Sequence, residues 1–400
     1  MFGNAIIGQS GGPTAVINSS LCGVIEECLR SKDQANPKGV IGNILGMRHG
    51  IEGFMQDRVA DLGALPEDVI KRLSRTPSSA LGSCRYKLKD EDFPRILEQL
   101  KKYGVRYYFL IGGNDTMDTI HRVEKYCKGQ GYDLCGVGIP KTVDNDLFAT
   151  DHTPGFPSAA RYVAMSVLQA GLLLRAMRGT DQFMLCQTVG RSAGWLPAAA
   201  ACAKRDEEDA PHIILVPERP FVKDAFLAAA KSAYDKYGMV YIVCGEGVTY
   251  ADGTPVSASG LTDNFGNVEF GATAGALAVQ ALHKMLGEAF GWRGEFQIPE
   301  SFKMVASDRA MELDYDEAYA CGQRAVQLAL SGVSGVMVTI VRESDSPYRS
   351  SFSTAPLSEV ALGEKPLPDE YIDGERLFVT EKALEYLRPL VGELPVYAKI

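Results

Sequence analysis

The feature that most limits the fold of this chain is a repeated pattern in which a short, strongly apolar run ends in a glycine-rich or polar turn before a helix-length segment. The apolar runs cover residues 4–8, 105–113, 134–140, 183–190, 212–217, 239–247 and 335–341. Continuous apolar runs are typical of strands that are buried on both faces in parallel sheets with helical crossovers. Apolar residues recur at helical spacing over residues 15–30, 116–128, 158–177, 223–238 and 274–287. The sequence therefore predicts an α/β fold with mostly parallel sheets.

Length and composition narrow the class of protein. A chain of 400 residues is too long for one ordinary core and suits two domains. Its 41 basic and 50 acidic residues give a formal charge of -9, which argues against a general nucleic-acid or anionic-membrane binder. Neither a basic leader nor a long apolar segment opens the chain, and the nine cysteines include no CxxC pair. We therefore expect a cytoplasmic protein with reduced thiols and small-molecule partners, with no nucleic acid and no membrane.

Ligands of open parallel sheets bind beyond the carboxyl ends of the strands, so the turns after the apolar runs are the candidate site. The first turn, GQSGGPT, places Gly11 and Gly12 just before a predicted helix, where backbone N–H groups and the helix dipole favour an anion. Its spacing matches neither the dinucleotide fingerprint nor the Walker loop. A phosphate site is one interpretation, and a plain strand-to-helix turn is the alternative.

Two further turns concentrate polar groups. Residues 111–119, IGGNDTMDT, leave an apolar run through Gly113 into Asn114 and Asp115, where a carboxylate is either a ligand or a helix cap. Residues 141–146 hold a denser cluster, consisting of Lys141, Thr142, Asp144, Asn145 and Asp146. Such a cluster is costly after a buried strand unless it faces a ligand, a metal or its own members. A lysine, a carboxylate and a nearby metal are what phosphoryl transfer requires.

The chain contains, in this order, the seven motifs GGPTAVINSS, LGSCRYKL, GGNDTMDT, PKTVDNDL, TPGFPSAARY, VGRSAGWLPAAAA and GEGVTYADG. In order and spacing they resemble the motifs of the 6-phosphofructokinases, and within that family those of the pyrophosphate-dependent branch. The resemblance covers roughly residues 1–320. It implies two Rossmann-like three-layer domains with the active site in the interdomain cleft. It also implies reversible phosphoryl transfer to the 1-hydroxyl of fructose 6-phosphate in glycolysis and gluconeogenesis, by a homodimer or homotetramer.

On the donor side, the resemblance implies binding by Gly11, Gly12, Arg85, Lys87, Gly113 and Asp115, with a plain surface charge as the alternative for Arg85 and for Lys87. ATP-using members resemble GGDGS at residues 112–116 and carry glycine in place of Lys141. A carboxylate at Asp115 would fill the volume of the inner phosphate of a nucleotide and repel its charge, whereas Lys141 can neutralise pyrophosphate. Pyrophosphate is therefore the expected donor, and an ATP-dependent phosphofructokinase is the nearest alternative.

The resemblance also implies roles in catalysis. Asp144 resembles the general base, Asp146 supports it electrostatically, and Lys141 and Arg191 complete the catalytic set. The family usually has a magnesium-binding aspartate where this chain has Asn114, and an amide oxygen is a weaker ligand for a hard cation. Mg²⁺ stays the expected cofactor, with Asn114 and Asp115 as candidate ligands.

The sugar side is less complete. The residues that the resemblance assigns to the sugar phosphate are Thr142, Val189, Gly190, Arg191 and Glu246, with an interior ion pair as the alternative for Glu246. A later QR motif of the family is not recognisable, so Lys303 and Arg309 are the candidates for the 6-phosphate. Sedoheptulose 7-phosphate therefore stays open as the sugar. A non-catalytic phosphate-sensing relative stays open as well.

The expected domains are discontinuous. A phosphoryl-donor domain is predicted for residues 1–138 with about 248–300, and a sugar-phosphate domain for 139–247 with about 301–400. In the second domain, the Pro- and Ser-rich segment 345–375 is expected to wrap the surface before a closing helix.

Overall fold

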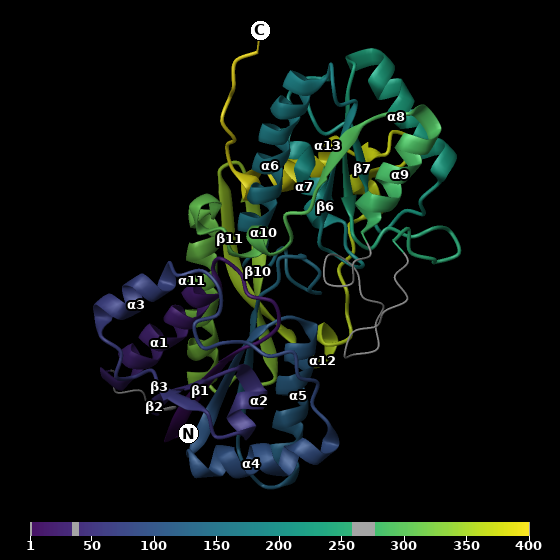
Figure 1. Ribbon diagram of the computed structural model, residues 1–400. Helices are drawn as coiled ribbons and strands as arrows, with labels where there is room; N and C mark the ends of the chain where they lie inside the picture. Colours follow the sequence, from purple (N-terminus) through teal and green to yellow (C-terminus); the bar gives the residue numbers. More distant parts are fainter. Residues whose placement is uncertain (1, 34–39, 258–276, 400) are drawn as a thin grey trace. The chain divides into compact units, whose positions relative to one another are not determined.

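The structure is a computed structural model that describes residues 2–33, 40–257 and 277–399. The chain divides into two compact units. The first unit comprises Met1–Phe156 and Met304–Lys365, and the second comprises Pro157–Lys303 and Pro366–Ile400. Each unit contains a β-sheet with helices packed against it (Figure 1).

The sheet of the first unit has seven strands in the order β11-β10-β5-β4-β1-β2-β3. The pairings from β10 through β5, β4 and β1 to β2 are parallel, whereas β11 and β3 are antiparallel edge strands. The strands are β1 (Phe2–Gln9), β2 (Val40–Met47), β3 (Val59–Asp61), β4 (Val105–Gly112), β5 (Cys135–Pro140), β10 (Val336–Asp345) and β11 (Tyr348–Pro356).

Helices cover both faces of this sheet, and successive residues of one strand are buried on opposite faces. Ala5 and Ile7 of β1 belong to the core beneath α1, α3 and α11, whereas Ile6 belongs to the core beneath α2, α4, α5 and α12. This two-sided burial is why the strand sequences are continuously apolar. The helices are α1 (Ile17–Asp33), α2 (Gly50–Met55), α3 (Glu67–Ser74), α4 (Phe93–Lys102), α5 (Asn114–Gly129), α11 (Glu312–Leu330) and α12 (Leu357–Val360).

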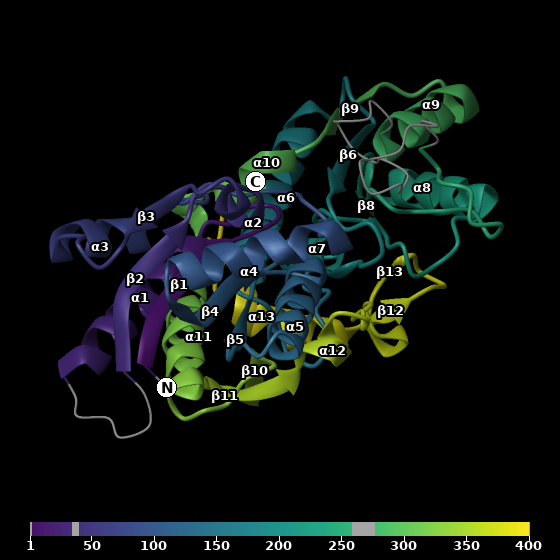
Figure 2. The ribbon, with the colours of Figure 1, turned by 90° about the horizontal axis from the view of Figure 1, so that it is seen from below.

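The second unit has a four-stranded parallel sheet in the order β7-β8-β6-β9. Helices α8 and α9 share a core with one face of it, and Figure 2 shows α6 and α7 on the other side of β6 and β8. The strands are β6 (Phe183–Thr188), β7 (Ile213–Leu215), β8 (Val240–Gly245) and β9 (Gly294–Gln297). The helices are α6 (Phe156–Met177), α7 (Trp195–Ala199), α8 (Lys223–Tyr237), α9 (Ala278–Phe290) and α13 (Glu381–Val391).

Smaller elements complete the chain. Strands β12 (Ile372–Asp373) and β13 (Phe378–Val379) form a short antiparallel pair, and α10 (Glu300–Val305) spans the boundary between the units. Short 3₁₀ turns occupy Asp90–Asp92, Ala200–Ala203, Ser307–Arg309 and Asp369–Tyr371.

The predicted α/β class with mostly parallel sheets is confirmed. Residues 345–375, expected to wrap the surface before a closing helix, include a strand that was not predicted: β11 pairs with β10 along its whole length, and α13 follows the segment. The sequence of β11 hides this strand, since its side chains are mostly polar and only partly buried. Among the helices in the described residues, none combines the length and apolarity needed to cross a bilayer.

The grouping of the chain differs from the predicted boundaries. Residues 304–365 pack with the first unit because β10 pairs with β5, and residues 277–303 pack with the second because α9 and β9 lie against β6. Residues 258–276, the middle of the predicted 248–300 segment, and the first residues of the predicted helix 274–287 lie outside the described residues. The assignment of donor and sugar roles to the two domains stays a prediction.

Candidate active site

The three polar turns lie together in the first unit because their strands are neighbours. Strands β1, β4 and β5 are adjacent and parallel, so the turns that follow them leave the same edge of the sheet. Backbone hydrogen bonds join the turns. The N–H of Ser10 donates to the carbonyl of Ile111 at 3.0 Å, and that of Lys141 donates to the carbonyl of Gly112 at 3.1 Å.

Lys141 connects the third turn to the first. Its side chain is 4% exposed, and its Nζ donates to the carbonyl of Gly12 at 2.7 Å. Gly11 has a φ of 75°, and a Cβ there would lie 3.2 Å from the Nζ of Lys141. Only glycine combines this left-handed conformation with so close an approach of the ammonium. The turn therefore presents bare backbone to a buried cation.

The pKa of Lys141 is set by its burial and by three charged side chains near it. Burial lowers the pKa of its ammonium to about 8, the carboxylates of Asp144 and Asp146 oppose this effect, and the guanidinium of Arg85 adds to it. A lysine whose pKa is shifted toward neutrality by burial, in a group of other charges, is typical of a functional site. An anion bound beside both groups would neutralise Arg85 and stabilise the charged form of Lys141.

The turn that holds Arg85 lies against the first turn. The N–H of Gly11 donates to the carbonyl of Cys84 at 3.2 Å, and the hydroxyl of Ser83 donates to the carbonyl of Gly11 at 2.6 Å. A Cβ on Gly12 would lie 4.0 Å from Nη2 of Arg85. Arg85 is exposed, and so is Lys87, for which the described residues show no ion pair or side-chain hydrogen bond. The structure thus brings Arg85 to the first turn and does not do so for Lys87.

The turn after β5 holds the predicted general base. The N–H of Asp144 donates to Oγ1 of Thr142 at 3.1 Å, and the hydroxyl of Thr153 donates to the carbonyl of Thr142 at 2.8 Å. Burial raises the pKa of Asp146, and the positive charge of Lys365 is the main nearby charge that lowers it. Asp144 and Asp146 therefore lie in one compact turn, in which Thr142 has a supporting contact.

Asn114 begins α5, directly after the glycines of the second turn. Gly112 is required by packing, since a Cβ there would lie 2.1 Å from Oγ1 of Thr116. The amide Nδ2 of Asn114 donates to the carbonyl of Gly363 at 3.1 Å. A carboxylate at this position has no hydrogen to donate, so the amide makes a contact that the usual aspartate could not make.

The start of α5 holds the two candidate metal ligands, Asn114 and Asp115. Asn114 and Asp115 are consecutive, and consecutive helical residues do not face one point. Among the described residues there is no group of three or more His, Cys, Asp or Glu side chains that could hold a metal. Exposed Asp115 can supply one carboxylate. This fits Mg²⁺, which keeps several waters and commonly binds through one carboxylate and the phosphates of a substrate.

In the second unit, the predicted sugar residues follow β6 and β8, which are adjacent and parallel. Oε1 of Glu246, which is 8% exposed, accepts a bond from the N–H of Gly190 at 3.3 Å. Gly190 has a φ of 119°, and a Cβ there would lie 2.4 Å from the carbonyl oxygen of Ala193. The backbone of exposed Arg191 lies against Gly247, where a Cβ would meet its carbonyl oxygen at 1.7 Å. Val189, Gly190, Arg191 and Glu246 thus form one cluster.

The two candidates for the 6-phosphate do not share a unit. Lys303 is 2% exposed and belongs to the second unit, where its charge lowers the pKa of the Cys186 thiol against the larger effect of burial. Arg309 belongs to the first unit, is half-exposed and lies 3.6 Å from a carboxylate oxygen of Asp308. Their common role stays a prediction.

Comparison with known proteins identifies the family. The family described as Phosphofructokinase matches residues 4–308. The chain belongs to the phosphofructokinase family.

Its similarity to individual members extends over nearly the whole chain. It is 39% identical over 394 residues to the pyrophosphate–fructose 6-phosphate 1-phosphotransferase of Halomonas elongata, which covers 97% of this chain and 91% of that protein. It is 40% identical over 402 residues to the protein of the same name from Xanthomonas campestris pv. campestris, and the matched region covers 98% of this chain and 93% of that protein. The crystal structure of a pyrophosphate-dependent phosphofructokinase from Marinobacter aquaeolei superposes with a TM-score of 0.87 at 35% identity, over 99% of this chain and 94% of that one. Phosphotransferases of this family generally use a divalent metal.

Sequence reasoning missed two charged groups that hold turns of the candidate site in place. Oε1 of Glu218 accepts bonds from the N–H groups of Gly194 at 2.8 Å and Leu367 at 2.7 Å, and burial raises the pKa of this carboxyl. It thereby ties the turn after β6 to the C-terminal segment. Lys365 contacts the turn after β5 across 220 residues of sequence. No local pattern marks either residue, since both act on backbone far away in the sequence.

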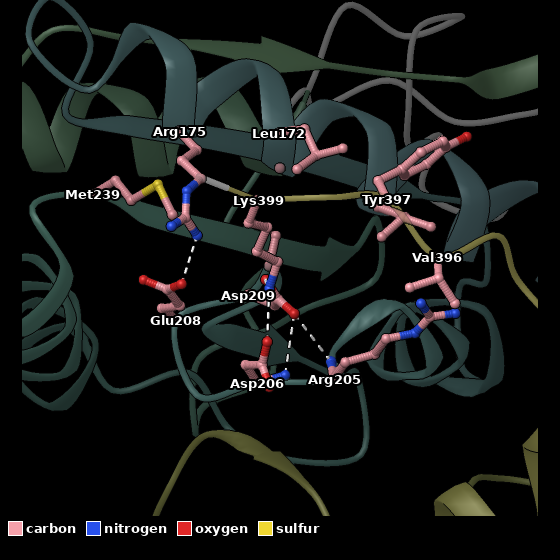
Figure 3. Close-up of a pocket in the computed structure, with 13 residues that line it drawn as sticks. Leu172, Arg175, Arg205, Asp206, Glu208, Asp209, Met239, Val396, Tyr397 and Lys399 are labelled. Carbon is pink, nitrogen blue, oxygen red and sulfur yellow. Dashed lines mark hydrogen bonds and ion pairs between the residues drawn. The ribbon is translucent and has the colours of Figure 1, made fainter.

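A cavity of about 240 Å³ in the second unit is lined by none of these residues (Figure 3). Its lining includes the ion pairs of Arg175 with Glu208 and of Lys399 with Asp206. The cationic groups of these pairs are neutralised by neighbouring carboxylates. The cavity contains none of the predicted site residues, so it is not part of the candidate active site.

Proposed function

We propose that this chain transfers a phosphoryl group from pyrophosphate to the 1-hydroxyl of fructose 6-phosphate, giving fructose 1,6-bisphosphate and phosphate. The observation that carries the proposal is its similarity, over more than nine-tenths of both chains, to proteins named for this reaction. Pyrophosphate and the product are similar in phosphoryl potential. The reaction is therefore reversible and serves both glycolysis and gluconeogenesis.

The position of Lys141 supports pyrophosphate as the donor. Its ammonium is buried against Gly12, and the nearby charge of Arg85 lowers its pKa. Two cations, Lys141 and Arg85, therefore lie at the glycine-rich turn. A short dianionic or trianionic donor satisfies both cations without an adenine pocket. Asp115 at the start of α5 would repel the inner phosphate of a nucleotide, which is the predicted reason that ATP is a poor donor.

Asp144 is the proposed general base. It takes the proton of the sugar 1-hydroxyl as the oxygen attacks the nearer phosphorus of pyrophosphate, and phosphate leaves with the bridging oxygen. Lys141 and Arg85 stabilise the charge that spreads over the phosphoryl oxygens. Asp146 supports Asp144 electrostatically, and Thr142 contacts the transferred group. Bound Mg²⁺ would neutralise phosphate charge, with Asp115 as its protein ligand and Asn114 as a weaker candidate.

The proposed sugar site comprises Val189, Gly190, Arg191 and Glu246, with Thr142 at the reacting end. The bond from Gly190 to Glu246 supports this assignment, because it fixes a carboxylate beside a bare backbone turn. Lys303 and Arg309 stay the candidates for the 6-phosphate. We also expect the enzyme to act in the cytoplasm as a homodimer or homotetramer. Sedimentation analysis measures the assembly, and a monomer at working concentration would contradict it.

The test is product formation by the purified chain from pyrophosphate and fructose 6-phosphate in Mg²⁺ buffer. Parallel reactions contain EDTA, or sedoheptulose 7-phosphate in place of the sugar. We expect fructose 1,6-bisphosphate in the first reaction, loss of product with EDTA and recovery when Mg²⁺ is returned. If bisphosphate formed only from the seven-carbon sugar, sedoheptulose 7-phosphate would take the place of fructose 6-phosphate as the proposed acceptor. No product from either sugar would favour a non-catalytic, phosphate-sensing protein.

A further inference from the structure

Residues 363–365 lie along the turn that holds the proposed general base. The backbone N–H of Lys365 donates to the carbonyl of Asp146 at 2.9 Å. Glu364 and Leu147 form an isolated antiparallel bridge next to this bond. The segment therefore pairs with the turn as a short strand would, although it is more than 200 residues away in the sequence.

The same segment also contacts the start of α5. The carbonyl of Gly363 accepts the bond from Nδ2 of Asn114 at 3.1 Å. A Cβ on Gly363 would lie 2.6 Å from Cβ of Phe148, so only glycine lets the two backbones approach. One three-residue segment thus contacts both the donor-side helix and the turn of the general base.

The side chain of Lys365 anchors this contact. Its Nζ donates to Oδ1 of Asn145 at 3.0 Å and to the carbonyls of Thr150 at 3.2 Å and Asp151 at 2.6 Å. These three acceptors lie around a single ammonium, which has three hydrogens to donate. Burial lowers the pKa of Lys365 to about 7, and the charges of Asp151 and Asp146 oppose this effect.

The turn needs such an anchor because its backbone is strained. Asn145 has a φ of 56° and Ala149 a φ of 65°, both in the left-handed region. A residue with a Cβ loses about 1–2 kcal/mol in this conformation, least for Asn. Strained residues of this kind persist only where the surroundings hold them. Lys365 contacts the turn on both sides of Ala149, at Asn145 and at Thr150.

We propose that Lys365 is a positioning residue for phosphoryl transfer: it fixes the strained turn 145–151 and thereby sets the place of Asp144 without touching a substrate. This inference rests on the proposed function. Asn145 lies between Asp144 and Asp146, so the bond that fixes its side chain also fixes the two carboxylates beside it. The charge of Lys365 favours the ionised form of Asp146 as well.

The first test compares Lys365→Met with Lys204→Met, which is a matched control. Lys204 also donates to two backbone carbonyls, those of Glu207 and Asp209 at 2.6 Å each, but it lies in the second unit and outside the proposed site. Lys365→Met should lower kcat about a hundredfold, because small misplacements of a reacting group cost this much, while KM for both substrates stays within about threefold. Lys204→Met should keep kcat within about twofold. A kcat of Lys365→Met within about threefold of the wild type would overturn the proposal.

A second measurement does not depend on activity. In Lys365→Met, backbone amides of residues 144–151 should exchange with deuterium about tenfold faster than in the wild type, with no such change in the second unit. Unchanged exchange would overturn the proposed anchoring. If the wild type forms no fructose 1,6-bisphosphate, the proposed function fails, and hydrogen exchange alone decides whether Lys365 fixes the turn.

A further variant serves if Lys365→Met does not fold. Asn145→Gly removes one acceptor of Lys365 while glycine keeps the left-handed backbone without strain. We expect kcat to fall about tenfold with little change in KM, since one of three anchoring bonds is lost. A variant with wild-type kcat would count against the anchor.

Discussion

Substitution of Lys141 by methionine tests the donor side of the site most sharply. The side chain keeps its length and apolar stem but loses the charge that lies 2.7 Å from the carbonyl of Gly12. Loss of one hydrogen-bond donor that stabilises the charge developing in the transition state typically raises the activation free energy by about 3–4 kcal/mol. At about 1.36 kcal/mol for each factor of ten, kcat/KM for pyrophosphate should fall about 10²–10³-fold. Lys89 is an exposed lysine of the same unit whose Nζ lies 3.8 Å from Oε1 of Glu91, and it supplies the control Lys89→Met, with an expected change within about twofold.

The same substitution should not destabilise the fold. The pKa of Lys141 lies at about 8, below its ordinary value of 10.5, because burial disfavours the charged form. At about 1.4 kcal/mol per pKa unit, the charged side chain costs the folded state about 3 kcal/mol at neutral pH, which methionine avoids. The lost bond to Gly12 offsets about 1–3 kcal/mol of this gain. The melting temperature should therefore stay the same or rise while kcat/KM falls.

The pH dependence gives a third readout of the same variant. The cation is present below a pKa of about 8 and is lost as the pH rises through it. The ratio of wild-type to variant kcat/KM, which cancels titrations common to both proteins, should therefore fall about tenfold per pH unit above 8. Steady-state rates at several pyrophosphate concentrations from pH 6.5 to 9.5 provide the ratio. A kcat/KM within about threefold of the wild type at pH 7, or a ratio that does not change with pH, would refute the role of Lys141.

Three further predictions concern residues of the first unit. Asp144→Ala should lower kcat about 10³-fold while sugar affinity, measured by calorimetry, changes little, and normal turnover would exclude a general base at this position. The double variant Asp115→Gly with Lys141→Gly should gain measurable turnover with ATP, and strict dependence on pyrophosphate would contradict the exclusion argument. His152→Gln should lose about 3 kcal/mol in urea unfolding near pH 6, because it breaks a buried pair with Asp151 at 2.8 Å and Glu317 at 2.6 Å. Burial lowers the pKa of His152, but the bonds to the two carboxylates have the larger combined effect, so its pKa is raised above the ordinary 6.5. The stability that the charged imidazole contributes should therefore decline, and the loss in the variant should shrink, as the pH rises above about 6.5. A loss that does not depend on pH would argue against a charged imidazole.

The strands and turns of the fold could be predicted because their signals are local. Ile6 and Ile7 are buried on opposite faces of the sheet, and such two-sided burial leaves a continuous apolar run in the sequence. Gly11 marks a turn where a Cβ would crowd the ammonium of Lys141. Neighbouring parallel strands then bring the turns after them to one edge, so residues 130 positions apart were expected to share a site.

The supports of the site could not be predicted because their partners are distant and their chemistry is generic. Lys365 donates to backbone carbonyls, which every residue has, and Asn145 lies 220 positions away. Asn114 was interpreted only as a weakened metal ligand, since its bond to Gly363 spans 249 positions. Strand β11 escaped prediction for a different reason: an edge strand with polar side chains carries little apolar signal.

The central claim is that pyrophosphate, and not ATP, is the donor. The most direct test measures kcat/KM for each donor with one preparation of the wild type, with saturating fructose 6-phosphate and Mg²⁺, by the appearance of fructose 1,6-bisphosphate. We expect a kcat/KM for pyrophosphate at least about 10²-fold above that for ATP, since Lys141 favours one donor and Asp115 repels the other. Equal values, or a preference for ATP, would contradict it.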